Sequence, residues 1–181
     1  CNYSQTELGK KISSFINGAN SVFFMSEKQK QLYIEHLPEI SKTNLHVLSS
    51  LFTDGFFEFI DKLNEKKYEK SKWVVLGSTS WVKGVSESEE WCKENEMEYE
   101  IVQGLNSNEF LKKLANSEGI CFKPTGLDTC PRFVIEAKLL GCALELNENV
   151  QHVEEKWFNS DKENIITYLR TRKDFFWKES F

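Results

Sequence analysis

The sequence has no apolar run long enough to cross a membrane. A spanning helix needs about 20 consecutive apolar residues, whereas the longest runs here are short ones such as VFFM at 22–25 and WVVL at 73–76. The pattern of a secretory signal peptide is missing as well. We therefore expect no transmembrane segment, and a cytoplasmic location that is either free or peripheral to the inner face of the membrane.

Motifs for metal sites and for disulfide frameworks are also missing. The five cysteines form no CxxC pair, and the three histidines stand far apart with no HExxH. Zinc sites use closely spaced Cys and His ligands, so we expect no metal ion. An odd number of cysteines without a close pair is typical of a reducing compartment.

The sequence has no basic patch with interleaved aromatic residues. Its 23 Lys and Arg and 28 Asp and Glu are interspersed and give a net charge of −5. Nucleic-acid binding needs clustered cations, so we expect no nucleic-acid partner. What the sequence does have is a hydrophobic fraction of 40% and an aromatic fraction of 13%, enough at this length to bury one good core.

Predicted strands alternate with predicted helices. The stretch 56–72 is amphipathic and then rich in Lys and Glu, and its end is either a solvated linker or the last turns of a helix. The alternation of strands with helices along the chain favours an α/β fold, namely a doubly wound Rossmann-like parallel sheet with helices on both faces. The predicted strands are 21–26, 45–50, 73–78, 99–104, 119–124 and 142–147, and the predicted helices are 27–37, 85–96, 107–117, 131–140 and 163–180.

Ligands of such sheets bind at the carboxyl ends of the strands. The loop GSTSWVKG (77–84) follows one predicted strand. Gly77 and Gly84 allow a tight backbone path, and Lys83 stands just before the next helix, an arrangement that favours an anion such as phosphate. The spacing matches neither the Walker pattern nor GxGxxG, so an ordinary loop remains the alternative.

A second such loop opens the stretch GLDTCPRFVIEAKLLGC (126–142). Thr129 is a natural N-cap and Pro131 suits a first helical position, so we predict a helix from about residue 130. Arg132 in its first turn indicates an anion nearby, because the helix dipole disfavours a cation there by about 0.3–1 kcal/mol. Glu136 either forms an i,i+4 salt bridge with Arg132 or accepts hydrogen bonds from ligand hydroxyls.

The ordered segments resemble the carboxyl-terminal half of a retaining glycosyltransferase of the GT-B fold, in the large family 4 (group 1). That family reads G-R-x-KG, then G-x-x-x-x-x-E-L, then E-G-F-G-x-x-x-x-E-A-x-A-x-G. The corresponding segments here are GSTSWVKG, VQGLNSNEFLKKLANSEGICFKP and GLDTCPRFVIEAKLLGC, followed by LELNENVQH. The resemblance covers roughly 73–158, and residues 20–50 resemble the end of the amino-terminal half.

The resemblance implies a role for each matching residue. Lys83 would hold the donor diphosphate, Asp128 would lie near the transferred sugar, and Glu136 would bind the ribose hydroxyls. Lys83 and Asp128 are thus the expected catalytic residues. The other expected donor-binding residues are Gly77 and Ser78 in the first loop, Gly104 and Leu105 at the nucleobase, and Thr129, Cys130 and Arg132 at the distal phosphate and sugar.

Two positions depart from the family pattern. Ser78 stands where the family has an arginine, and Asp128 is one methylene shorter than the family glutamate. Arg132 could supply the missing charge, which we infer from its place in the helix and not from the resemblance. Lys83, Arg132 and the amides at 130–132 would then stabilise the leaving nucleotide electrostatically, without a metal or cofactor.

The implied reaction transfers a hexose with retention, in carbohydrate biosynthesis, from a nucleotide-sugar to a saccharide or lipid-linked acceptor. Residues 1–50 would be the end of the acceptor half, with one βαβ unit and the hinge, and residues 51–181 the donor domain with its closing helix. Because the chain begins at Cys1 without Met and shows no full acceptor domain, we expect donor binding without transfer by this chain alone.

Other positions have structural interpretations or leave alternatives open. The cluster Phe175, Phe176 and Trp177 has no obvious cover in the sequence, which predicts either self-association through 163–181 or poor order in that helix. His152 is either a ligand contact or part of a capping loop. Rival functions are an epimerase-like nucleotide-sugar enzyme and a nucleotide-binding α/β module without catalysis. The residues interpreted as core are Trp73, Trp91, Phe110 and Phe122.

Overall fold

The computed structural model describes residues 5–42 and 44–181. The chain divides into two compact units. The amino-terminal unit holds the residues up to 52 together with 151–181, and the sheet unit holds residues 53–150. The sequence had placed 151–181 with the donor domain, whereas their contacts group them with the amino-terminal segment. Within the described ranges, no helix is long and apolar enough to span a membrane.

The sheet unit is built on four parallel strands. They are β3 (Trp73–Leu76), β4 (Tyr99–Val102), β5 (Gly119–Phe122) and β6 (Ala143–Leu146), in the order β4-β3-β5-β6. Val74, Val75 and Ile120 are at most 1% exposed. Near-continuous apolar runs of this kind are typical of parallel strands that are buried on both faces. The predicted α/β class with a parallel sheet is confirmed.

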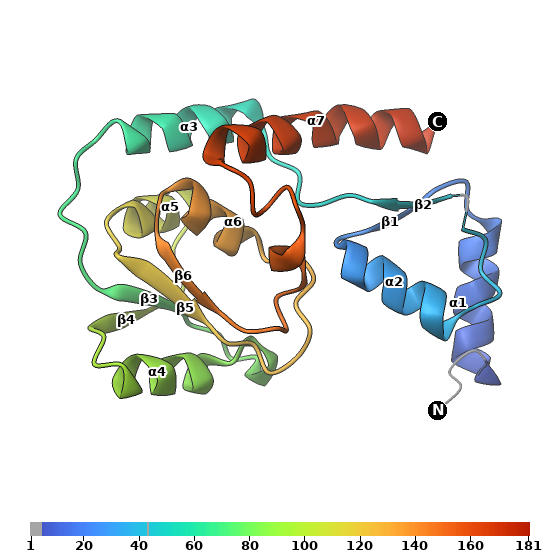
Figure 1. The fold of residues 1–181 in the computed structure, drawn as a ribbon, viewed down its shortest axis with the longest axis horizontal. Helices are drawn as coiled ribbons and strands as arrows, with labels where there is room; N and C mark the ends of the chain where they lie inside the picture. Colours follow the sequence, from blue (N-terminus) through green and yellow to red (C-terminus); the bar gives the residue numbers. More distant parts are fainter. Residues whose placement is uncertain (1–4, 43) are drawn as a thin grey trace. The chain divides into compact units, whose positions relative to one another are not determined.

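Helices cover both faces of this sheet (Figure 1). The helix α4 (Val85–Glu94) packs on β3 and β5 from one face, while α6 (Arg132–Leu139) packs on β5 and β6 from the other. On the same side as α6 lie α5 (Ser107–Ala115) and α3 (Asp54–Asn64) (Figure 1). The stretch 56–72 is therefore helical only to Asn64, and 65–72 connects α3 to β3 without a helix or strand.

The start of α6 differs from the prediction. We expected a helix from about 130 with Thr129 as its cap, but the helix begins at Arg132 and Pro131 occupies the cap position without a side-chain hydrogen bond. Pro131 has an extended ψ of 114°, and a proline also disfavours helical geometry in the residue before it, here Cys130. Arg132 is consequently the first helical residue.

The amino-terminal unit contains the predicted βαβ segment. Its strands β1 (Val22–Phe24) and β2 (Leu45–Val47) pair in parallel, joined by α2 (Glu27–His36), and α7 (Lys162–Ser180) belongs to the same unit. An additional helix, α1 (Glu7–Gly18), was not predicted; Thr6 caps it by accepting a hydrogen bond from the Gly9 amide at 2.9 Å. The core of this unit is formed by Ile16, Phe24, Leu37, Ile40 and Leu45.

The aromatic cluster on α7 is partly covered, so the expectation of an uncovered cluster is wrong. The Phe23 ring lies 5.2 Å from Phe176 and 6.4 Å from Phe175, measured between ring centroids. His46 lies 6.0 Å from Phe175. Trp177 remains 54% exposed. Side chains of β1 and β2 therefore cover Phe175 and Phe176. Of the three aromatic residues from which self-association was predicted, Trp177 is the one that stays exposed.

His152 is a core residue of the amino-terminal unit. It is 0% exposed, and its ring lies 4.7 Å from Phe158 and 5.9 Å from Trp157. This burial leaves no surface for a ligand contact. Of the four residues interpreted as core, Trp73 and Phe122 are buried, while Trp91 and Phe110 are only half-buried.

Candidate functional site

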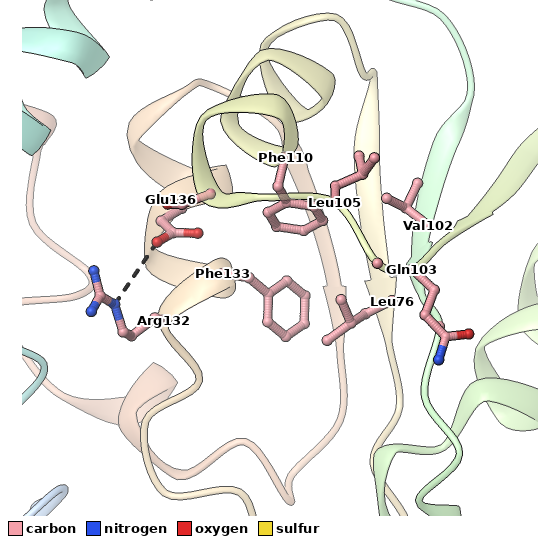
Figure 2. A pocket seen from close by; sticks show the side chains of 11 residues that line it. Leu76, Val102, Gln103, Leu105, Phe110, Arg132, Phe133 and Glu136 are labelled. Atoms are coloured by element: carbon pink, nitrogen blue, oxygen red, sulfur yellow. Dashed lines mark ion pairs between the residues drawn. The ribbon is translucent and has the colours of Figure 1, made fainter.

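The strand order creates a crevice at the carboxyl edge of the sheet. From β3 the chain goes to β4 on one side and then crosses to β5 on the other, so the loops after β3 and β5 lead to α4 and α6 on opposite faces. Ligands of open α/β sheets bind at such a point. A cavity of about 390 Å³ lies at the same carboxyl edge, beside this point, between the ends of β3 and β4, the start of α5 and the first turns of α6 (Figure 2).

Five of the predicted site residues line this cavity. They come from the loop after β3, the loop after β4 and helix α6, which are far apart in the sequence. Their convergence shows that the sheet brings three of the predicted segments to one place. These residues are Gly77, Gly104, Leu105, Arg132 and Glu136.

Two glycines shape the mouth of the cavity. A Cβ atom on Gly77 would lie 2.9 Å from both the Gln103 Cβ and the Ile101 Cγ2, so only glycine lets the end of β3 lie this close to β4. Gly104 has a φ of 76°, which favours glycine. Directly after it, Asn106 and Glu109 form a capping box that starts α5. These features fix the backbone that borders the cavity.

Aromatic rings form the middle of the cavity, between its charged wall, formed by Arg132 and Glu136, and the end of β4 (Figure 2). Phe133 packs edge-on against Phe122 with centroids 4.7 Å apart, and against Phe110 at 6.4 Å. Phe110 and Phe133 both line the cavity. The sequence had placed Phe110 in the core and assigned no role to Phe133. The signal available was their position in the first turns of the two helices that follow ligand-edge loops.

Glu136 is a buried carboxylate on the charged wall. The residue is 7% exposed, and its ion-pair partner is Arg132, with Nε 3.9 Å from Oε1. That distance exceeds a hydrogen bond. Burial raises the pKa of Glu136, and the nearby Arg132 guanidinium lowers it to a smaller extent. The structure is compatible with both interpretations of Glu136. The i,i+4 ion pair with Arg132 is present, and the carboxylate also faces the cavity, where a ligand could reach it (Figure 2).

Lys83 and Asp128, the two expected catalytic residues, are in direct contact. The Lys83 Nζ lies 2.7 Å from the Asp128 Oδ2 and 6.0 Å from the centre of the Phe122 ring. The Asp128 amide donates to the Asn149 carbonyl at 2.8 Å, which holds the aspartate beside the end of β6. This pair lies next to the cavity through Phe122, whose neighbour Phe133 lines it.

Gly84 allows the loop that carries Lys83 to pack closely against the backbone after β5. Gly84 follows the short 3-10 turn Trp81–Lys83 with a φ of 59°. A Cβ atom there would lie 1.8 Å from the Lys123 carbonyl oxygen. The loop after β3 therefore rests on the backbone that follows β5, and the Thr125 amide reinforces this contact by donating to the Val82 carbonyl at 3.0 Å.

Besides Lys83 and Asp128, three more predicted residues lie outside the cavity lining: Ser78, Thr129 and Cys130. The Ser78 hydroxyl accepts a hydrogen bond from the Ser80 amide at 3.1 Å, so it stabilises its own loop. Cys130 is buried at 6% exposure, and Thr129 is half-buried. Their roles in sugar and phosphate binding stay predictions. Across residues 5–42 and 44–181, no group of three or more Cys, His, Asp or Glu residues is placed to hold a metal ion.

No protein-family model, curated protein or solved structure matches this chain.

Proposed function

We propose that the sheet unit binds a nucleotide-sugar at the carboxyl edge of its sheet, as the donor-binding half of a retaining hexosyltransferase of the GT-B, family 4-like type. The observation that carries this proposal is Glu136. Glu136 is 7% exposed, and its ion-pair partner Arg132 lies 3.9 Å away, so keeping its carboxylate charged costs free energy. Groups of this kind cluster at functional sites.

The cavity, together with Lys83 beside it, would give each part of a nucleoside diphosphate a contact. Phe110, Phe133 and Leu105 provide apolar contacts for a nucleobase, as small-molecule sites usually do. The backbone at Gly104 can read the polar edge of the base. Glu136 accepts hydrogen bonds from the ribose hydroxyls, and Lys83 lies where the diphosphate would extend toward the loop after β3.

The proposed chemistry is a glycosyl transfer with retention. The bond between the anomeric carbon and the diphosphate oxygen breaks, and the acceptor hydroxyl oxygen bonds to the same face of that carbon. The hydroxyl proton passes to the departing phosphate. Lys83 stabilises the negative charge that develops on the leaving group, and Asp128 contacts the hydroxyls of the sugar. The acceptor is a saccharide or a lipid-linked saccharide.

Calorimetric titration with UDP, GDP and ADP, each with and without an attached hexose, tests this proposal. The wild-type chain should bind one of these nucleotides, and Lys83→Ala should weaken the binding by about 1–3 kcal/mol, the scale of a charged hydrogen bond. Lys62→Ala on α3, outside the cavity lining, is the matched control and should leave affinity unchanged. Equal affinities of wild type and Lys83→Ala would remove the phosphate role of this lysine.

A further inference from the structure

The charges around the cavity cancel in the ligand-free chain. Lys83 is paired with Asp128, and Arg132 is paired with Glu136. A nucleoside diphosphate brings further negative charge, which is unfavourable beside carboxylates unless a cation turns toward it. At least one of the two cations must therefore exchange its carboxylate for phosphate when the ligand binds.

The two ion pairs differ in how tightly they are held. The Lys83 Nζ and the Asp128 Oδ2 are 2.7 Å apart, the length of a strong charge-assisted hydrogen bond. The Arg132 Nε and the Glu136 Oε1 are 3.9 Å apart, and the arginine side chain is 55% exposed, so this pair is weak. Of these two ion pairs, the one between Arg132 and Glu136 is therefore the weaker.

Arg132 is also the better placed cation. Among the described residues it is the one cation that lines the cavity, and Figure 2 shows it beside Glu136 on the charged wall. Its planar guanidinium matches a phosphate through two parallel hydrogen bonds, which a lysine cannot reproduce. The cation of the loop after β3, Lys83, lies outside the lining and is held by Asp128 at 2.7 Å.

We infer that Arg132 binds the diphosphate in addition to Lys83, turning from Glu136 to the phosphate oxygens as the ligand enters. The same movement frees the Glu136 carboxylate to accept hydrogen bonds from the ribose hydroxyls. Both residues thus exchange each other for a part of the ligand. The inference rests on the proposed function and adds a phosphate-binding residue, together with the partner exchange that engages it.

The test compares a nucleoside with its diphosphate, for whichever base the wild-type chain prefers. Calorimetry or NMR titration gives both affinities for wild type, Arg132→Gln and Arg132→Lys. Arg132→Gln should lower diphosphate affinity about tenfold or more and leave nucleoside affinity within about twofold. The diphosphate affinity of Arg132→Lys should lie between those of wild type and Arg132→Gln, because lysine keeps the charge but cannot form the two parallel hydrogen bonds of a guanidinium. Lys112→Gln, which removes the same charge from α5 outside the lining, is the control.

A second pair of variants guards against a folding defect, because Arg132→Gln leaves Glu136 buried without its partner. In the Glu136→Gln background, adding Arg132→Gln should still reduce the diphosphate affinity. An unchanged ratio of diphosphate to nucleoside affinity, in Arg132→Gln and in the double variant, overturns the inference while the proposed function stands. Failure of the wild-type chain to bind any nucleoside diphosphate removes the proposed function and this inference with it.

Discussion

Replacing Glu136 by glutamine should make the ligand-free chain more stable while weakening its binding. Burial raises the pKa of Glu136 in the folded chain. An acid with a raised folded-state pKa contributes stability below its unfolded pKa, and that contribution is lost as pH rises through the folded value. Above the unfolded pKa the wild-type chain therefore loses stability through this buried acid, and the neutral glutamine removes that loss.

The structure sets the size of this effect. The Arg132 side chain is 55% exposed and 3.9 Å away, so its attraction returns no more than about 1 kcal/mol. Burying a charge costs several times as much. The glutamine amide is itself a buried polar group and gives back about 1–3 kcal/mol of this difference. We therefore expect a net gain of about 1 kcal/mol for Glu136→Gln, which corresponds to a Tm increase of roughly 2–4 °C in a chain of this size. An exposed ion pair, as the sequence suggested, would have predicted almost no change.

The effect on binding should have the opposite sign. Glutamine keeps one acceptor oxygen but loses the charge, and a hydrogen bond to a charged group is worth about 1.5–3 kcal/mol. Nucleotide affinity should fall about tenfold or more. A ligand-binding residue that is strained in the free chain shows both changes together, whereas a purely structural residue does not.

Thermal unfolding from pH 4.5 to 8, with calorimetric titration at pH 7.5, measures both effects. The Tm difference between Glu136→Gln and wild type should grow as pH rises. Glu94→Gln, an exposed acid on α4, should show neither effect. A lower Tm for Glu136→Gln with unchanged nucleotide affinity would refute the reasoning, because it would make the Arg132 pair a stabilising structural contact.

Two further predictions concern the loop after β3 and the buried thiols. Gly84→Ala should destabilise the chain by about 1–3 kcal/mol or more in chemical denaturation, because φ is 59° and the new Cβ would lie 1.8 Å from the Lys123 carbonyl oxygen. Gly55→Ala is the control, since its Cβ would meet nothing within 4 Å, and it should not destabilise the chain. Equal effects of the two substitutions would contradict the predicted clash. Burial raises the pKa of Cys121 to about 12, so mass spectrometry after alkylation at pH 8 should find this residue unmodified until the chain unfolds; rapid labelling of the native chain would contradict its burial.

Much of the fold follows from local sequence pattern, but the bounds of α6 do not. Runs such as WVVL and GICF are apolar throughout and short, which favours a strand buried on both faces. The start of α6 was displaced because Pro131 adopts an extended ψ, a choice made by the preceding loop and not by the helix sequence. The helix α1 escaped prediction, and its apolar residues Leu8 and Phe15 are exposed.

The site was predictable only in part, for a physical reason. Apolar residues in a helix face inward whether they meet core or cavity, so Phe110 could not be distinguished from a core residue. The contact between Lys83 and Asp128 depends on the pairing of β3 with β5, which the sequence does not specify. Glu136 gave two interpretations because an i,i+4 spacing with Arg132 fits both, and its burial is what favours the ligand.

The central claim is that the cavity at the carboxyl edge of the sheet unit holds a nucleoside diphosphate. An amide NMR titration of the chain with UDP, GDP and ADP tests it most directly. The account predicts saturable shifts for one of these nucleotides, concentrated at Gly77, Gly104, Leu105 and the first turn of α6. Shifts that are absent for all three nucleotides, or that map away from these residues, would contradict it.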